Sequence, residues 1–521
     1  MAQPGSSRSA RAVSDTAKLF SARLAAGIVS ILFTAWLLRV MPAEELAIWP
    51  IILAVAGIVE GLGSLGMGDT LVRRVPRYLA AEDEEAASRL LRTAVVLNVA
   101  ACIAIMAIID SQAVWTAEHL LGDAAKANVI RMAGLAALLV AIQKRLEWGL
   151  KATQQFGRIA SLGLLMNSLR TPLATVMYVT TGFGGLLVAF AVVPAIGCIL
   201  TVAWLWKYLW RSGGFEPLGE LLRFSLPYYG VSIASILRSR AHYLVVGLLT
   251  SPEILGVFFV ASKVSGYLEE LNRFAVSVIT PKLAEKAGVA PNARPGALGV
   301  CSRYVFLVFL PLHLGVALLA GPAIQIFAGS TYVDAAPILS VLALAVFVQL
   351  LFDVHRAHIQ VYAPPVHLLW LQVIAGVADV TIMGALVFYY GALGAAAAKL
   401  VTYALMAGVA AYLLSRSMPL IYDERGIKIA LRGALVLCLA CGAIVLALET
   451  PVLVVLVGAA LGTIAYLLSL TRQLAERDVN VLIEALPKRV QEFVEAHVRP
   501  FAAHWFVSPP STDTPLEGVD H

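Results

Sequence analysis

The sequence predicts an all-α membrane protein, a polytopic bundle of about 14 transmembrane helices. Its composition is the first reason, because 60% of the 521 residues are hydrophobic and only 14% are charged. The mean hydropathy is +0.82, and a soluble domain cannot bury that much apolar surface, whereas a lipid bilayer can. The second reason is a series of apolar stretches of about 20 residues, the length that crosses the hydrocarbon core. They lie at 19–40, 46–68, 91–110, 129–149, 159–181, 184–206, 224–249, 254–279, 303–325, 335–355, 366–389, 392–415, 429–448 and 451–471.

Several of these stretches are joined by very short connections. Gly182-Phe183, Tyr390-Gly391 and Glu449-Thr450 each form a whole predicted turn. Short turns on one side of the membrane and longer loops on the other are typical of an antiparallel helix bundle.

A short motif occurs twice, about two hundred residues apart. The first copy reads Met41-Pro-Ala-Glu-Glu-Leu-Ala-Ile-Trp49 and the second reads Thr250-Ser-Pro-Glu-Ile-Leu-Gly-Val-Phe258. Each copy lies between two long apolar runs. Many secondary transporters consist of two repeated halves that move about a central site. The repeat therefore indicates a transporter.

The positions of the charged loop residues predict the orientation. Basic residues gather in alternate loops, and such loops remain in the cytoplasm. The opposite loops hold a single basic residue, Lys126, among several acidic ones. Both termini are therefore expected in the cytoplasm, and the net charge of +6 reflects topology, with no nucleic-acid partner implied. The basic loop residues are Arg73, Arg74, Arg77, Arg89, Lys151, Arg158, Lys207, Arg211, Arg223, Lys282, Lys286, Arg294, Arg416, Arg425 and Lys428.

The two ends of the chain differ from the bundle. Residues 1–18 are expected to form a cytoplasmic segment before an uncleaved first span, because the run at 19–40 is too long for a signal peptide. Residues 472–507 show apolar residues at helical spacing among charges, which predicts an amphipathic helix on the inner leaflet or against the cytoplasmic loops. Residues 508–521 read as a disordered tail.

Charged residues at membrane depth are the candidates for a functional site, because each costs roughly 2.5–3.5 kcal/mol to insert. Arg170, Arg238 and Arg240 lie near the middle of their predicted spans, and Lys263 lies inside the eighth. Guanidinium groups suit bidentate contact with phosphate, so these residues predict an electropositive chamber for an anionic substrate. The alternative is that they form structural ion pairs with buried carboxylates.

Three carboxylates at membrane depth are candidates for ion coupling: Glu60, Asp353 and Asp379. A carboxylate in a low dielectric can exchange a proton during a transport cycle. Pairing with the arginines is the alternative for all three. Arg273 follows Glu269 by four residues and is expected to pair with it on one helix face, and Lys399 is close enough to its helix end to extend toward the membrane surface.

Enzymatic chemistry is not expected. The sequence contains no G-x-x-x-x-G-K-[ST] motif and no soluble domain of sufficient size for a catalytic site. All five cysteines fall inside apolar runs, where they act as small hydrophobic residues. No metal and no cofactor is predicted.

The chain resembles the lipid-linked oligosaccharide flippases of the Wzx type, in the multidrug/oligosaccharidyl-lipid/polysaccharide (MOP) exporter superfamily. Ala47 stands where relatives usually have glycine, whereas the second copy of the repeat keeps Gly256. The segments that carry the resemblance are Leu37–Trp49, Leu65–Arg74, Leu222–Tyr229, Ser251–Phe258, Ala261–Val264 and Pro281–Ala284.

The resemblance implies a MATE-like fold with two pseudo-symmetric six-helix lobes and two further spans. The N-lobe would comprise residues 19–211, the C-lobe 212–415 and the added spans 416–471. Relatives move polyprenyl-diphosphate-linked sugars from the cytoplasmic to the outer leaflet of the bacterial inner membrane by alternating access, for O-antigen or exopolysaccharide synthesis. The arginines would then hold the diphosphate, and a polysaccharide polymerase and a chain-length regulator would be partners beside the membrane lipids.

Three other functions fit parts of the sequence. A cation-coupled multidrug exporter of the toxic-compound extrusion type would need an acidic or aromatic chamber, while the central charges here are mostly basic. A membrane enzyme acting on lipid-linked sugars would need a large outer loop. A scramblase or assembly subunit without coupled transport is the third.

Overall fold

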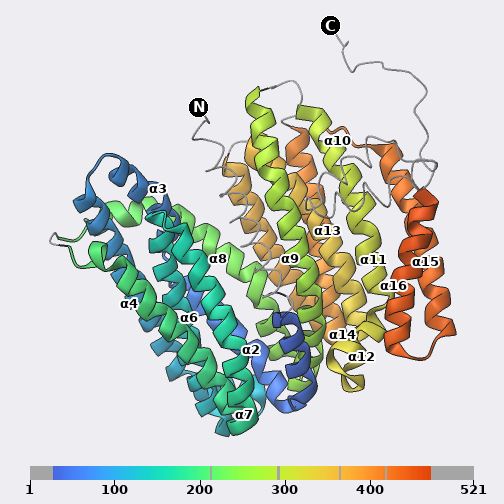
Figure 1. The fold of residues 1–521 in the computed structure, drawn as a ribbon, viewed down its shortest axis with the longest axis horizontal. Helices are drawn as coiled ribbons and strands as arrows, with labels where there is room; N and C mark the ends of the chain where they lie inside the picture. The colour runs from blue at the N-terminus through green and yellow to red at the C-terminus, as the bar shows by residue number, and fades with distance from the viewer. Residues whose placement is uncertain are drawn as a thin grey trace, which may run out of the picture.

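The computed structural model describes residues 27, 29–211, 214–289, 294–362, 365–416 and 419–470. Within these ranges every regular element is helical (Figure 1). By length and composition, nine helical segments of the described chain can cross a membrane. The predicted segments 1–18, 472–507 and 508–521 lie outside the described residues.

Two of the helices are hairpins and supply two spans each. In α7 (Phe156–Leu209) the backbone reverses at Gly182, with φ 68° and ψ −153°. In α14 (Pro365–Ser415) it reverses at Gly391, with φ 55° and ψ −137°. Glycine adopts positive φ without steric cost, which permits both turns. The short connections predicted at 182–183 and 390–391 are therefore confirmed.

The other helices follow the predicted order. With the two hairpins divided into their halves, the nine candidate spans cover eleven of the 14 predicted stretches. Helices α8 and α9 and the shorter apolar helix Val29–Val40 lie at the other three. The elements are α2 (Ala43–Leu62), α3 (Met67–Ala80), α4 (Glu84–Ser111), α5 (Ala113–Leu121), α6 (Ala127–Ala152), α8 (Leu218–Leu249), α9 (Pro252–Val289), α10 (Arg294–Tyr304), a π-helical turn Val305–Phe309, α11 (Leu310–Leu318), α12 (Ala320–Ala328), α13 (Ala335–Tyr362), α15 (Glu424–Ala447) and α16 (Pro451–Leu470).

One predicted span is wrong in its bounds. Residues 303–325 were expected to form one helix, but the apolar segment runs from Leu298 to Leu318 and α12 starts a new helix at Ala320. Proline lacks the N–H that continues a helix, and Pro322 lies at the start of α12. The π-helical turn at 305–309 changes the register further.

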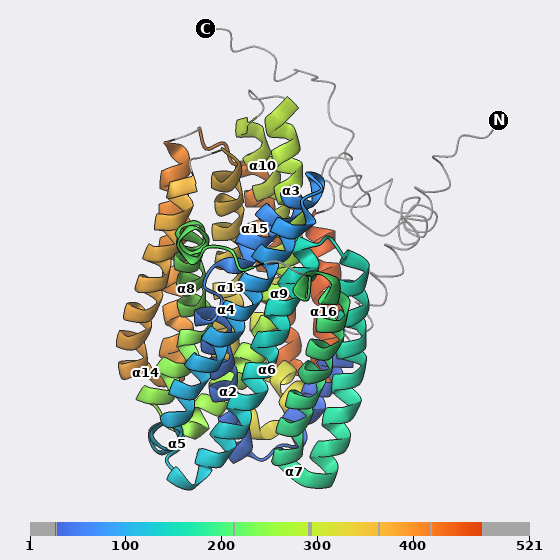
Figure 2. The same cartoon turned by 90° about the vertical axis from the view of Figure 1, so that its left-hand side faces the viewer.

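The helices form two groups side by side. In Figure 1, α3, α4, α6 and α7 lie on the left, and α9, α11 and α13–α16 lie on the right. Helices α2 and α8 run between the two groups, and α2 packs on α6, α8 and α9. Figure 2 places α3 and α10 at one end of the bundle, with α5 and the turn of α7 at the other.

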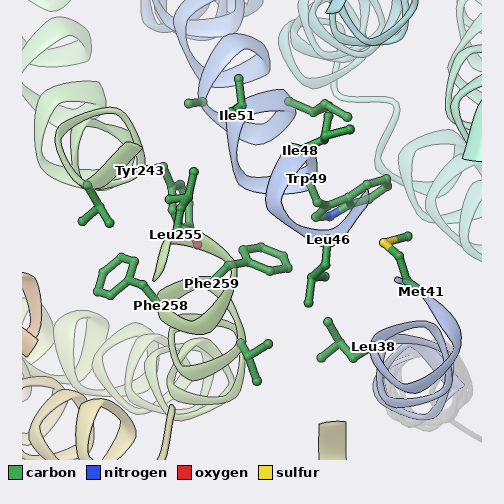
Figure 3. Packing of buried hydrophobic residues seen from close by; sticks show 14 of the residues in the cluster. Leu38, Met41, Leu46, Ile48, Trp49, Ile51, Tyr243, Leu255, Phe258 and Phe259 are labelled. Atoms are coloured by element: carbon green, nitrogen blue, oxygen red, sulfur yellow. The ribbon is translucent and has the colours of Figure 1, made fainter. Parts of the chain in front are cut away.

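The two copies of the sequence repeat meet at the centre of the largest buried cluster. Leu46 of the first copy lies toward Phe259 at the start of α9 (Figure 3). Trp49 points the other way and packs on Phe183 and Phe190 of α7. Phe258, the residue equivalent to Trp49, is fully buried. The feature that predicted two repeated halves therefore also joins them.

The equivalent positions of the two copies lie next to each other. A Cβ placed on Gly256 would lie 3.9 Å from the backbone nitrogen of Ala47 and 4.0 Å from its Cα. Aligning Leu46 with Leu255 makes Ala47 and Gly256 the same position of the repeat. When equivalent residues contact each other, the contact lies on a two-fold axis. A pseudo-two-fold axis therefore passes between α2 and α9 at this point.

Candidate functional site

A cavity of about 320 Å³ lies in the middle of the bundle. It is walled by helices from both halves of the chain: α2 supplies one residue, and α8, α9, α13 and α14 supply the others. Its lining residues are Leu53, His242, Tyr243, Ser262, Lys263, Gly266, Tyr267, Glu269, Glu270, Arg273, Gln349, Lys399 and Tyr403.

Helix α9 contributes most of the charge in the cavity wall. Arg273 Nη2 lies 2.6 Å from Glu270 Oε1, and Arg273 Nη1 lies 4.0 Å from Glu269 Oε2. The predicted pairing of Arg273 with Glu269 is confirmed, although Glu270 is its closer partner. One guanidinium thus neutralises part of the charge of two carboxylates within the cavity.

The predicted anion-binding residues divide into three groups. Lys263 lines the cavity. Arg238 and Arg240 belong to α8, a turn or less before the buried His242 that also lines the cavity; their side chains lie outside the described residues. Arg170 does not line this cavity.

Arg170 lies instead in the first half of α7, away from the residues above. Its Nη2 donates to Asn167 Oδ1 at 3.0 Å. The side chain is half-buried, on the helix face that also carries the buried Leu162, Met166 and Ala174. Arg170 is therefore not part of this cavity, and a single chamber that holds both Arg170 and Lys263 stays a prediction.

The predicted ion-coupling carboxylates lie on three separate helices, and none lines the cavity. Glu60 on α2 pairs with Lys144 of α6 at 2.5 Å, and its backbone carbonyl accepts from Arg145 at 2.8 Å. Asp353 on α13 pairs with Arg356 at 3.0 Å. Among the pairs described, neither carboxylate meets the arginines that were expected as alternative partners.

Asp379 on α14 is buried, with 4% of its surface exposed. It shares its face with Leu371, Ala375 and Met383, which are also buried. This face points into the protein, so Asp379 remains a candidate for ion coupling by position. It lies on the first half of α14, whereas the cavity residues Lys399 and Tyr403 lie on the second half.

Sequence reasoning missed the importance of Lys399. Its distance from the helix end predicted an ammonium reaching the membrane surface, but the residue is only 7% exposed and lines the cavity. The prediction failed because α14 packs on α13 and α8, and position along one helix does not reveal such neighbours. The available signal was Tyr403, four residues later on the same helix face.

The sequence matches the polysaccharide biosynthesis protein family over residues 36–337. That is more than half of the chain. The chain belongs to this family. The predicted relationship to polysaccharide exporters is confirmed. No curated protein matches the sequence at a significant level.

Solved structures with similar folds belong to the MOP superfamily. The lipid II flippase MurJ, in an inward closed conformation, aligns with a TM-score of 0.66 at 13% identity, over 87% of this chain and 97% of that one. An inward-facing multidrug resistance MATE transporter aligns with a TM-score of 0.61 at 16% identity, over 75% of this chain and 94% of that one. A Pyrococcus furiosus transporter described as having a binding pocket of reverse polarity aligns at 0.51 and 15% identity, over 76% and 92%. The predicted MATE-like fold of a multi-pass membrane protein is confirmed.

Proposed function

We propose that this protein is a secondary transporter that moves a polyprenyl-diphosphate-linked oligosaccharide from the cytoplasmic to the outer leaflet. The observation that carries the proposal is the charged cavity that α8, α9, α13 and α14 line, with Leu53 of α2 at its wall. Membership of the polysaccharide biosynthesis family supports a glycan as cargo. O-antigen or exopolysaccharide synthesis in the bacterial inner membrane is the setting that fits this cargo.

The size of the cavity fits the head of such a substrate. Pockets of about 300–1,000 Å³ hold a drug-sized ligand, and this cavity measures about 320 Å³. A diphosphate with its neighbouring sugar is of that size. The lipid tail is too long for the cavity and would lie among the helices or in the bilayer.

The charges in the wall favour an anion over an organic cation. Both carboxylates, Glu269 and Glu270, lie at Arg273 and are partly neutralised by it. Lys263 and Lys399 add two ammonium groups from different helices. A multidrug exporter for cations would need the carboxylates free, so the anionic lipid-linked sugar is the better fit.

Alternating access is the proposed mechanism of transfer. The fold aligns with the inward-facing MATE structure at a TM-score of 0.61 and with the outward-facing one at 0.53. The contact between Ala47 and Gly256 would close the outer side in this state. Both termini would then lie in the cytoplasm, as the basic loops predict.

Complementation tests this function directly. The gene would be expressed in strains that lack their own oligosaccharide flippase, and surface glycan would be measured by gel and lectin binding. We expect the wild type to restore the glycan, and Lys263→Gln to restore less. Lys428→Gln provides the matched control, because Lys428 is exposed on α15 and pairs with Glu424 at 3.0 Å.

A second measurement separates transport from assembly defects. Purified protein in liposomes would be given a fluorescent polyprenyl-diphosphate sugar, and its accessibility to a membrane-impermeant quencher would be followed. Failure of the wild type both to restore any surface glycan and to move this lipid would contradict the proposed function.

A further inference from the structure

We propose that Lys399 forms an oxyanion-binding position in the cavity and contacts the charged group of the cargo. This inference rests on the proposed function, because it assigns one residue to the substrate of that site. Lys399 lies on the second half of α14, opposite the α9 residues that dominate the cavity wall.

The first argument is the burial of the charge. Lys399 is 7% exposed, yet it makes no hydrogen bond or ion pair with any part of the chain that the structure describes. Burying an ammonium group without a partner is costly, and proteins rarely retain such a group. An ionisable residue kept at membrane depth without a partner indicates a ligand that supplies the missing charge.

The second argument is the separation of Lys399 from the nearby carboxylates. Glu269 and Glu270 line the same cavity, but both lie at Arg273 on α9. Arg273 therefore occupies the two groups that could otherwise have paired with Lys399. The cavity thus holds the ammonium group of Lys399 on a different helix from the ion pairs of Arg273.

The third argument is a second unsatisfied polar group in the wall. The buried Oγ of Ser262 has no hydrogen-bond partner within the described ranges. A hydroxyl can donate to an anion, and Ser262 comes from α9 while Lys399 comes from α14. Two donors from different helices would hold an oxyanion between them.

The ligand chemistry is an oxyanion, and two parts of the cargo could supply it. One source is the diphosphate of the lipid carrier. The other is the carboxylate of an acidic sugar. Charge-assisted hydrogen bonds to either group are stronger than neutral ones, so both would gain from the ammonium of Lys399.

Binding measurements on the purified full-length protein test the proposal. The probes are undecaprenyl diphosphate against undecaprenol, and a hexuronate-containing trisaccharide against its neutral counterpart. Ligand-dependent thermal stabilisation gives the apparent affinity. The variants are Lys399→Gln and Lys399→Arg, with Lys428→Gln as the control for removal of one exposed positive charge.

We expect Lys399→Gln to weaken binding of one oxyanion probe by about tenfold or more, while the uncharged probes bind as before. Lys399→Arg should retain most of the affinity. Lys399→Gln should also unfold at a higher temperature without ligand, since an uncompensated buried charge is removed. A residue with a purely structural role would lower this temperature instead.

The outcomes distinguish the inference from the proposed function. Lys399-dependent binding of the diphosphate or of the hexuronate supports the oxyanion position and identifies its source. Binding of the diphosphate, with neither oxyanion probe weakened by Lys399→Gln, overturns the inference and leaves the proposed function intact. No binding of either oxyanion by the wild type overturns both.

Discussion

A cross-link between the two copies of the repeat should stop transport. The substitutions are Ala47→Cys and Gly256→Cys, in a background where the five native cysteines are replaced. If the lobes must separate at this contact for the cavity to open outward, a covalent bond here holds the protein in one state.

The geometry permits the bond. The ideal Cβ at position 256 lies 4.0 Å from Ala47 Cα, and adding a bond of about 1.5 Å limits the Cα–Cα distance to about 5.5 Å. Disulfides usually span 4.4–6.8 Å between Cα atoms. The two Cβ atoms lie somewhat more than 4 Å apart, so a short bifunctional thiol reagent should be used beside an oxidant.

The assay has two readouts. A protease site placed in the connection between α7 and α8 allows the halves to be separated on a gel unless the cross-link joins them. Transport of a fluorescent lipid-linked sugar is measured in liposomes before oxidation, after oxidation and after reduction. We expect nearly complete loss of transport with the cross-link and recovery after reduction.

A cross-link within one part of the protein is the matched control. The ideal Cβ at Gly462 lies 2.7 Å from Cys441 Sγ, within the packed pair α15 and α16. Gly462→Cys with Cys441 retained should cross-link these helices and leave transport unchanged.

If the 47–256 cross-link forms fully but transport continues, the reasoning about this contact is refuted. If it does not form, the two repeats do not meet as described.

Three further predictions concern stability and are checked by thermal unfolding in detergent. Phe258→Ala should destabilise the protein by about 3–5 kcal/mol, because the ring is fully buried and packs on His242 and Tyr243 of α8; a change below that of an exposed residue such as Phe388 would contradict this packing. Lys144→Gln should cost less than about 1 kcal/mol, because the Lys144 and Glu60 side chains remain 44% and 32% exposed; a larger loss would mean that the pair is shielded from solvent. Gly433→Ala should lower the unfolding temperature, because its Cβ would lie 2.7 Å from the ring of Tyr466 on α16; an unchanged temperature would show that α15 and α16 can separate without cost.

Local patterns were sufficient to predict the spans. The length of an apolar stretch can be counted directly from consecutive residues. The hairpins at Gly182 and Gly391 could be predicted because a glycine stands between two long apolar stretches. The bounds failed where Pro322 and the π-helical turn interrupted an otherwise apolar run. Such interruptions depend on backbone hydrogen bonding that composition does not reveal.

The site was harder to predict because its charges are partnered across long sequence separations. Glu60 meets Lys144 from a helix 84 residues later, and no spacing rule connects the two. Lys399 was assigned to the membrane surface from its depth along one helix alone. Which neighbours cover a helix is a property of the whole bundle, so the cavity appears only when α9, α13 and α14 are placed together.

The position of the pseudo-two-fold axis links the repeat to the mechanism. Both α2 and α9 begin at the contact, so two helix N-termini with partial positive charge lie side by side. Glu44 and Glu45 in the first turn of α2 and Glu253 in that of α9 offset this repulsion, and Glu45 is held by a hydrogen bond from Tyr178 at 3.0 Å. Only small residues, Ala47 and Gly256, stand at the point of contact. Because both residues are small, no large side chains interlock on the axis itself. The two helices can therefore move apart at this point without straining side chains there, although larger apolar residues surround it. Under the proposed alternating access, the repeat would therefore place a separable joint on the side opposite the basic loops, where an outward opening would be needed.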